Sequence, residues 1–176
     1  MDLALLVLRI VVGGLFVGHG AQKLFGAFGG HGLAGTAGFF EQIGLRPGHL
    51  HARAAGGAEF FGGALLALGL VTPFAAAALI ATMTAAIITV HYAKGIWSTE
   101  GGYEYNLVLI AAAFALTGVG PGAWSLDHAL SLNLNGAGWA LAALGVGILG
   151  GVGAIVSGRA ASRAATHHPP HGGVTA

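Results

Sequence analysis

The stretch that decides the fold comes first in the chain: residues 3–25 read LALLVLRIVVGGLFVGHGAQKLF. Polar side chains interrupt this run at few places, among them Arg9, His19 and Lys23. At about 1.5 Å of rise per residue, a helix of this length crosses a hydrocarbon core of about 30 Å. The run therefore predicts a membrane-spanning helix. Ionisable groups inside such a helix are costly and serve packing, proton handling or ligand binding.

The rest of the chain has the same apolar character. Hydrophobic residues make up 55% of the sequence and charged residues 7%, with a mean hydropathy of +0.79, whereas a soluble domain carries about 25% charged residues. Four further spans are predicted, at residues 52–71, 73–92, 105–119 and 138–157. The predicted fold is an all-α integral membrane helical bundle. It has a four-helix core in residues 1–130, a fifth transmembrane helix in residues 131–157 and a disordered His-rich tail in residues 158–176.

The connecting segments are predicted to lie at the membrane surface. The Gly-rich loop 26–51 is expected to hold a short interfacial helix near residues 35–43. The loop 93–104 carries Trp97 in an aromatic set suited to the headgroup zone. Many of the 33 glycines are expected at close helix contacts, and the G-x-x-x-G spacing occurs at Gly14 and Gly18 and again at Gly147 and Gly151.

The basic residues predict an orientation. Five crossings leave Arg9 alone, inside a helix, on the side of the N-terminus, and gather the others on the opposite side: Lys23, Arg46, Arg53, Lys94, Arg159 and Arg163. Because cytoplasmic loops carry the excess of Lys and Arg, the N-terminus is predicted outside and the C-terminus in the cytoplasm.

Composition also excludes several kinds of function. The absence of Cys excludes disulfides, iron–sulfur ligation and thiol catalysis within the chain. The formal net charge of +1 points to no nucleic-acid partner. No metal site is predicted, because the tail histidines around His168 offer no fixed geometry.

Polar residues from four predicted spans converge on the cytoplasmic half of the bundle. His19 and Lys23 lie one helical turn apart, and Glu59 lies about two turns into the second span. The side chains of His19, Lys23, Glu59 and Glu104 are expected around one cavity. The full predicted cluster consists of His19, Lys23, Glu59, His91, Glu104 and Asn106.

Simpler structural roles remain open for the same residues. Glu59 can neutralise Lys23 and hold two helices in register. Arg9 and Asp127, both toward the outer face, are predicted to form a structural ion pair. The remaining members can act as ordinary interface or capping residues, namely His91, Glu104 and Asn106.

Motifs that occur in order along residues 3–130 resemble the DoxX family of small bacterial membrane proteins, which usually have four helices. The first span carries Arg9-Ile10, Gly13-Gly14-Leu15-Phe16 and His19-Gly20-x-x-Lys23-Leu24-Phe25-Gly26. The matching positions further on are Glu59-Phe60-Phe61-Gly62-Gly63, Gly69-Leu70, Thr72, Trp97, Gly101-Gly102-Tyr103-Glu104-Tyr105-Asn106-Leu107, Gly122 and Ser125-Leu126-Asp127.

The resemblance implies a bacterial plasma-membrane protein linked to redox chemistry, since the family takes its name from a membrane subunit of a thiosulfate:quinone oxidoreductase. The hypothesis that follows is a quinone-linked oxidoreductase subunit that handles a quinone headgroup and its protons and does not act alone. Reduction to quinol takes up two protons, which His and Glu can donate near neutral pH. The hypothesis assigns catalysis to His19, Glu59 and Glu104 and ligand binding to Lys23, His91, Trp97 and Asn106.

Alternatives from other classes stay open at this point. His19 and His91 on separate spans can ligate b-type haem. The chain can instead be a non-catalytic anchor or assembly subunit of a respiratory or redox complex, with other protein subunits as partners. A third alternative is a pathway for small solutes or ions that the buried charges line.

Overall fold

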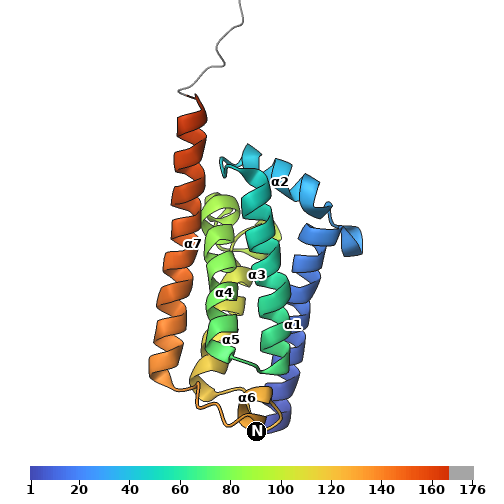
Figure 1. Cartoon of the computed structure of the whole chain (residues 1–176), viewed down its shortest axis with the longest axis vertical. Helices are drawn as coiled ribbons and strands as arrows, with labels where there is room; N and C mark the ends of the chain where they lie inside the picture. The colour runs from blue at the N-terminus through green and yellow to red at the C-terminus, as the bar shows by residue number, and fades with distance from the viewer. Residues whose placement is uncertain (167–176) are drawn as a thin grey trace, which may run out of the picture.

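The protein is a bundle of long antiparallel helices. The structure, a computed structural model, describes residues 1–166, and within that range it contains helices and turns but no strand. The long helices lie side by side and run alternately up and down (Figure 1). They are α1 (Asp2–Phe25), α3 (Gly48–Leu68), α4 (Thr72–Ala86), α5 (Glu104–Val119) and α7 (Ala137–Thr166). The predicted all-α membrane helical bundle is confirmed.

Three segments are long and apolar enough to cross a membrane: Asp2–Phe25, Thr72–Lys94 and Ala137–Ala164. The helix Glu104–Val119 is apolar but shorter. The helix α3 has a suitable length but carries several polar side chains, among them Arg53 and Glu59. The predicted count of five crossings stays a prediction.

Short elements close the two ends of the bundle. The helix α2 (Gly32–Gln42) lies across the end where α1 finishes and α3 begins (Figure 1), close to the short helix predicted at residues 35–43. The helix α6 (Leu126–Ala129) lies at the opposite end, beside the N-terminus. The helix α4 runs on into a π-helical turn, Ile87–His91. Pro73 stands at the start of α4, where its missing N–H costs no hydrogen bond.

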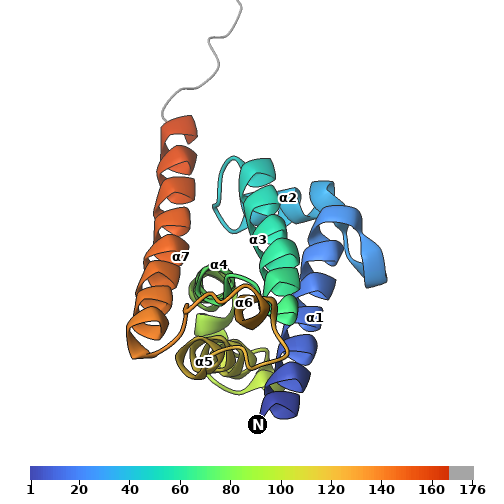
Figure 2. The same cartoon turned by 60° about the horizontal axis from the view of Figure 1, so that its bottom comes forward.

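The packing divides the bundle into a core and an added helix. The side chains buried between α1, α3, α4 and α5 form one cluster that includes Phe16, Leu66, Leu79 and Leu116. The helix α7 packs on α4 and α5 and lies away from α1 (Figure 2). Its contact with α4 is made through small residues such as Gly147 and Gly151.

The last helix is longer than the sequence predicts. The predicted boundary at residue 157 is wrong, because α7 continues to Thr166. Residues 158–164 are rich in Ala and Arg, which are strong helix formers, and this explains the extension. Gly158 also lies against the α2–α3 turn, where the Arg46 N–H donates to its carbonyl at 3.2 Å. The predicted disorder of residues 167–176 lies outside the described residues.

Candidate functional site

A buried ion pair joins α1 to α3. Lys23 Nζ lies 2.5 Å from Glu59 Oε2. The Glu59 side chain is 4% exposed, whereas that of Lys23 is 25% exposed. A carboxylate at such a buried position is tolerated when a partner charge and hydrogen bonds compensate for lost hydration. The pair is therefore a fixed feature of the α1–α3 contact.

Glycines bring the two helices close enough for this pair to form. A Cβ on Gly20 would overlap the backbone of Phe60, and one on Gly13 would lie 2.5 Å from the carbonyl oxygen of Gly63. A Cβ on Gly56 would lie 2.8 Å from the side chain of Leu24 and 3.2 Å from the Lys23 Cβ. The backbones of α1 and α3 thus touch along much of their length, and no larger residue fits at these positions.

His19 lies beside the ion pair on the neighbouring turn of α1. His19 and Lys23 are four residues apart on one face of α1. His19 Nδ1 lies 3.2 Å from Gln22 Oε1, and Gln22 Nε2 donates to the carbonyl of Phe28 at 3.3 Å. The structure thus joins Lys23 to Glu59 and His19 to Gln22, and a site shared by His19, Lys23 and Glu59 stays a prediction.

An open groove runs along the side of α1 that points away from the other helices, and it ends at His19. It is open to the outside along its length, has a volume of about 500 Å³ and is lined by Val11, Gly14, Leu15, Gly18, His19, Gln22 and Phe28. A Cβ on Gly14 or on Gly18 would meet no other atom within 4 Å, so these two glycines keep the groove open and make no helix contact. The groove is apolar along its length and polar at the end that His19 and Gln22 form. We name it the α1 groove.

Two other predicted site residues bind the loop between α4 and α5. Glu104 accepts hydrogen bonds from the backbone N–H of Ser98 at 3.0 Å and from its hydroxyl at 2.9 Å. His91 Nδ1 lies 2.7 Å from the Gly101 carbonyl oxygen. Both side chains hold the loop between α4 and α5, where Tyr92 also stacks on Tyr103.

The remaining two predicted site residues differ in their exposure. Asn106 is buried and donates from Nδ2 to the sulfur of Met83 at 3.2 Å, inside the core. Trp97 is 62% exposed. Within residues 1–166, no side-chain hydrogen bond or ion pair joins the loop group to Lys23 and Glu59. The printed partners of Glu104 are the N–H and hydroxyl of Ser98, and the expected cavity shared by Glu59 and Glu104 stays a prediction.

Arg9 and Asp127 lie at the opposite end of the bundle and do not form the predicted direct ion pair. The Arg9 side chain is buried, and its Nη2 donates to the carbonyl of Trp124 at 2.6 Å. Asp127 accepts instead from the N–H of Val71 at 2.7 Å and from the N–H and hydroxyl of Thr72 at 3.0 and 2.6 Å. No salt bridge within 4 Å joins the two residues in the described part of the chain.

Asp127 does not pair with Arg9 because its carboxylate binds the turn between α3 and α4. The first N–H groups of α4 lack partners within their own helix, and the Asp127 carboxylate takes that role. The guanidinium of Arg9 lies against Gly69, whose φ of 62° also favours glycine. Asp2 completes this end, since its carboxylate accepts from the N–H of Ala123 at 2.8 Å. We name the set Asp2, Arg9, Thr72, Trp124 and Asp127 the outer clamp.

The sequence analysis missed Gln22 and Phe28 in the α1 groove. Gln22 follows His19 by three residues and so lies on the same helical face, which is a signal that spacing offers. Phe28 has no such signal, because it stands in a turn with a φ of 51°.

Comparison with known proteins agrees with the fold and the motifs. The family model described as DoxX matches residues 4–92, just over half of the chain. The protein named "Putative oxidoreductase CatD" from Bacillus subtilis (strain 168) is 33% identical over 117 residues, which cover 66% of this chain and 81% of that protein. The "Uncharacterized membrane protein Rv3486" of Mycobacterium tuberculosis (strain ATCC 25618 / H37Rv) is 30% identical over 138 residues, covering 73% and 82%.

No solved structure matches the chain. The family match contains α1, α3 and α4, and with them His19, Lys23 and Glu59. The buried ion pair and the α1 groove therefore lie inside the matched region, whereas α7 lies beyond it. The chain is a multi-pass membrane protein that belongs to the DoxX family.

Proposed function

We propose that the protein is the membrane subunit of a quinone-linked oxidoreductase and that the α1 groove binds the quinone. The observation that carries the proposal is the position of His19. Its ring lines the polar end of the groove, one helical turn from Lys23, whose ammonium is paired with the buried carboxylate of Glu59. A histidine placed near both a ligand groove and a buried acid can pass protons between them.

The groove suits an amphipathic ligand with a small polar head and a long apolar tail. Val11, Gly14, Leu15 and Gly18 form an apolar lane that can hold an isoprenoid chain. At the end of the lane, His19 and Gln22 supply hydrogen-bond donors for a quinone carbonyl. The volume of about 500 Å³ lies in the range of about 300–1,000 Å³ that is typical of small-molecule sites.

A bound quinone supplies two-electron redox chemistry and takes up two protons on reduction. In this proposal a partner enzyme of the dehydrogenase class delivers the electrons. The two protons come from the cytoplasmic side: His19 hydrogen-bonds the headgroup and gives up a proton to it, Glu59 as a carboxylate takes up each replacement proton and passes it to His19, and Lys23 balances the charge of Glu59 between transfers. The name of the Bacillus subtilis relative, an oxidoreductase, supports a redox role.

The proposal includes the orientation that the basic residues predict. The end of the bundle with Lys23, Arg46, Arg53 and Lys94 faces the cytoplasm, so the polar end of the α1 groove opens near the cytoplasmic headgroups. Protons then enter the site from the cytoplasmic side.

The first test blocks the α1 groove with a larger side chain. Gly18→Leu places a side chain in the lane where a Cβ meets no other atom, so the fold is not strained. The matched control is Gly153→Leu on α7, which is equally open. Native mass spectrometry of the full-length protein in mild detergent with decyl-ubiquinone measures binding. We expect Gly18→Leu to weaken binding about tenfold or more, in line with the 1–3 kcal/mol of lost apolar contact, and Gly153→Leu to bind like the wild type.

His19→Ala tests the polar end of the groove. Loss of one hydrogen bond to the headgroup is expected to weaken binding by roughly tenfold. Equal binding by Gly18→Leu and wild type, or no binding by the wild type, overturns the assignment of this groove to a quinone.

A further inference from the structure

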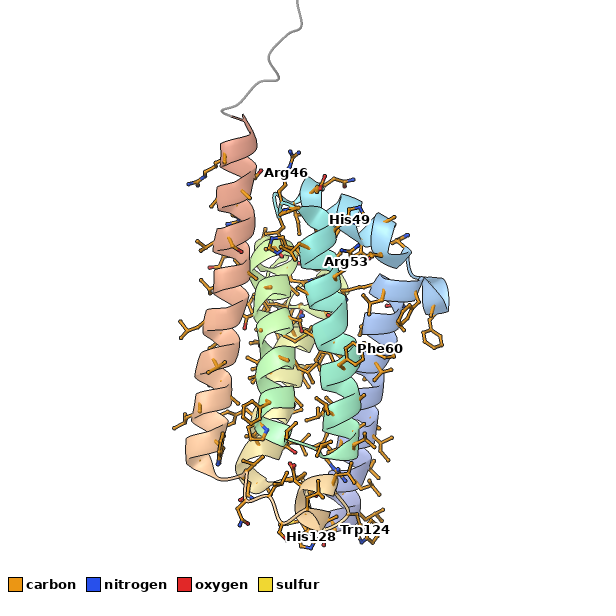
Figure 3. The ribbon with its side chains drawn as sticks, viewed as in Figure 1. Arg46, His49, Arg53, Phe60, Trp124 and His128 are labelled. Carbon is orange, nitrogen blue, oxygen red and sulfur yellow. The ribbon has the colours of Figure 1, made fainter. Side chains whose placement is uncertain are left out.

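A second surface, on α3, carries basic side chains that the proposed quinone site does not use. Arg46, His49 and Arg53 are exposed and follow one another along the start of α3, with Phe60 further down the same helix (Figure 3). His49 and Arg53 are four residues apart and so share one helical face. Arg46 stands in the turn just before the helix.

The positive charge of this surface is not neutralised by salt bridges. None of the ion pairs formed by the described residues involves Arg46, His49 or Arg53. Glu41 is the acidic residue that contacts this turn, and its carboxylate accepts from the N–H of Gly48 at 3.1 Å. The N-terminus of α3 adds a partial positive charge at the same place. The surface therefore favours an anion.

Directly below the basic residues, the same face of α3 is apolar and open. A Cβ on Gly57 would meet no other atom within 4 Å, and Phe61 and Leu68 are exposed. Phe60 packs edge to face against Phe25 and Phe61, which gives this lane an aromatic wall. From His49 to Phe60 the helix rises about 16 Å, which spans a lipid headgroup and the first part of its acyl chain.

We propose that this α3 face is a binding site for one anionic phospholipid. Its phosphate lies among Arg46, His49 and Arg53, and one acyl chain lies over Gly57 beside Phe61. A lipid fits because the cations lie at one end of an apolar lane on a membrane helix, a pattern that matches an amphiphile with a negative head. A soluble anion would use the cations and leave the lane empty. The site is independent of the quinone proposal, since it lies on a different helix.

The first experiment removes charge from the site and compares it with equal removal elsewhere. The double variant Arg46→Gln/Arg53→Gln and the control Lys94→Gln/Arg159→Gln each lose two exposed positive charges. Native mass spectrometry of the delipidated full-length protein titrated with phosphatidylglycerol measures affinity. We expect roughly thirtyfold weaker binding for Arg46→Gln/Arg53→Gln, at about 1 kcal/mol per basic residue, and less than threefold for the control. Equal losses in both variants overturn the site.

The second experiment tests the apolar half and the source of the anion. Gly57→Leu fills the lane without touching the cations and is expected to weaken phosphatidylglycerol binding at least fivefold, whereas Gly153→Leu leaves it unchanged. Inorganic phosphate at millimolar concentration is expected not to displace the lipid. Full displacement by phosphate, or wild-type affinity in Gly57→Leu, shows an anion site without a lipid lane and overturns the proposal. Binding of phosphatidylcholine as tight as that of phosphatidylglycerol also overturns it.

Discussion

The two partners of the buried ion pair differ in how well the protein tolerates each charge when the other partner is removed. Glu59 is enclosed between α1 and α3, whereas Lys23 is partly exposed near the end of its helix. A lysine at such a place can turn its ammonium group toward the headgroups when its partner is lost. A buried carboxylate has no such escape, and removal of its partner leaves an uncompensated charge.

This asymmetry gives a prediction for single substitutions. Lys23→Met is expected to destabilise the protein strongly, by about 3–5 kcal/mol, which is the usual effect of breaking a buried pair from one side. Glu59→Gln is expected to cost clearly less, because Lys23 can reach water. Thermal unfolding of the purified protein in one detergent measures both changes.

The double variant Lys23→Met/Glu59→Gln serves as the control for this pair. Because no buried charge is left, it should regain much of the stability lost in Lys23→Met. A larger loss in Glu59→Gln than in Lys23→Met would mean that the carboxylate, and not the ammonium, can escape to solvent.

Contacts between single residues were predicted correctly where two charged side chains lie on adjacent helices at a similar depth in the membrane. Lys23 and Glu59 were expected to meet, and they do. Arg9 and Asp127 were also placed at one end correctly, but Arg9 binds the backbone of the segment before α6, and Asp127 binds the backbone of the α3–α4 turn together with the Thr72 hydroxyl. Backbone donors and acceptors at turns have no residue-type signal, so the sequence favoured the obvious charge pair.

At the scale of helices, the glycines fall into two kinds that spacing alone does not distinguish. Gly147 and Gly151 contact α4, where Cβ atoms would lie 2.6 Å from Ile80 Cβ and from the Ala81 carbonyl oxygen. Gly14 and Gly18 have the same spacing but face away from the bundle. The neighbours Gly13 and Gly20 make the α1–α3 contact instead. Only the three-dimensional arrangement decides which face of α1 meets α3.

The two kinds of glycine should respond differently to one added methyl group. Gly20→Ala is expected to destabilise the protein by about 1–3 kcal/mol, because it overpacks a rigid backbone contact and separates α1 from α3. Gly14→Ala should be neutral or slightly stabilising, since Ala favours a helix more than Gly does. Unfolding temperatures of the two variants, measured side by side, check this difference. A destabilised Gly14→Ala variant would show that its face is covered in the native protein.

Helix boundaries were predicted best where an apolar run ends at a glycine or a proline. The end of α1 at Gly26 and the start of α4 beside Pro73 illustrate this. The C-terminal end of α7 was missed because Ala and Arg continue the helix after the apolar run stops. Hydropathy reports where a helix leaves the membrane, whereas helix propensity decides where it ends.

At the scale of the whole molecule, the charge distribution predicts an orientation that the chain makes simple to test. Because the sequence contains no Cys, a single introduced cysteine is the sole thiol. Glu100→Cys places it in the loop between α4 and α5, and Ala129→Cys places it at the end of α6, both at exposed positions. A membrane-impermeant maleimide added to intact cells is expected to label Ala129→Cys and to leave Glu100→Cys unlabelled.

Permeabilised cells provide the control for this measurement, since both variants should then react. Labelling of Glu100→Cys in intact cells would invert the orientation and place the polar end of the α1 groove outside. The lipid site on α3 would then lie in the outer leaflet.

The whole fold was more predictable than its site. Composition and apolar runs are sufficient for an all-α membrane bundle, because each span must satisfy its own backbone hydrogen bonds. The positions of His91 and Glu104 were not predictable to the same degree. Both lie at the expected end of the bundle, but their hydrogen-bond partners are Gly101 and Ser98 of the loop between α4 and α5, and such local contacts leave no signal in residue spacing.

The outer clamp has a mechanical consequence. It ties α1, the turn between α3 and α4, and the segment after α5 together at one end of the bundle through Asp2, Arg9 and Asp127. At the other end, Lys23 binds Glu59, Thr36 of α2 donates to the carbonyl of Lys23, and the Arg46 N–H donates to the carbonyl of Gly158. That end joins α1 to α2 and α3 and the α2–α3 turn to α7, whereas the outer clamp joins α1 to the α3–α4 turn and to the segment after α5. Loss of Arg9 or Asp127 should therefore release several segments together, because local opening proceeds in cooperative units.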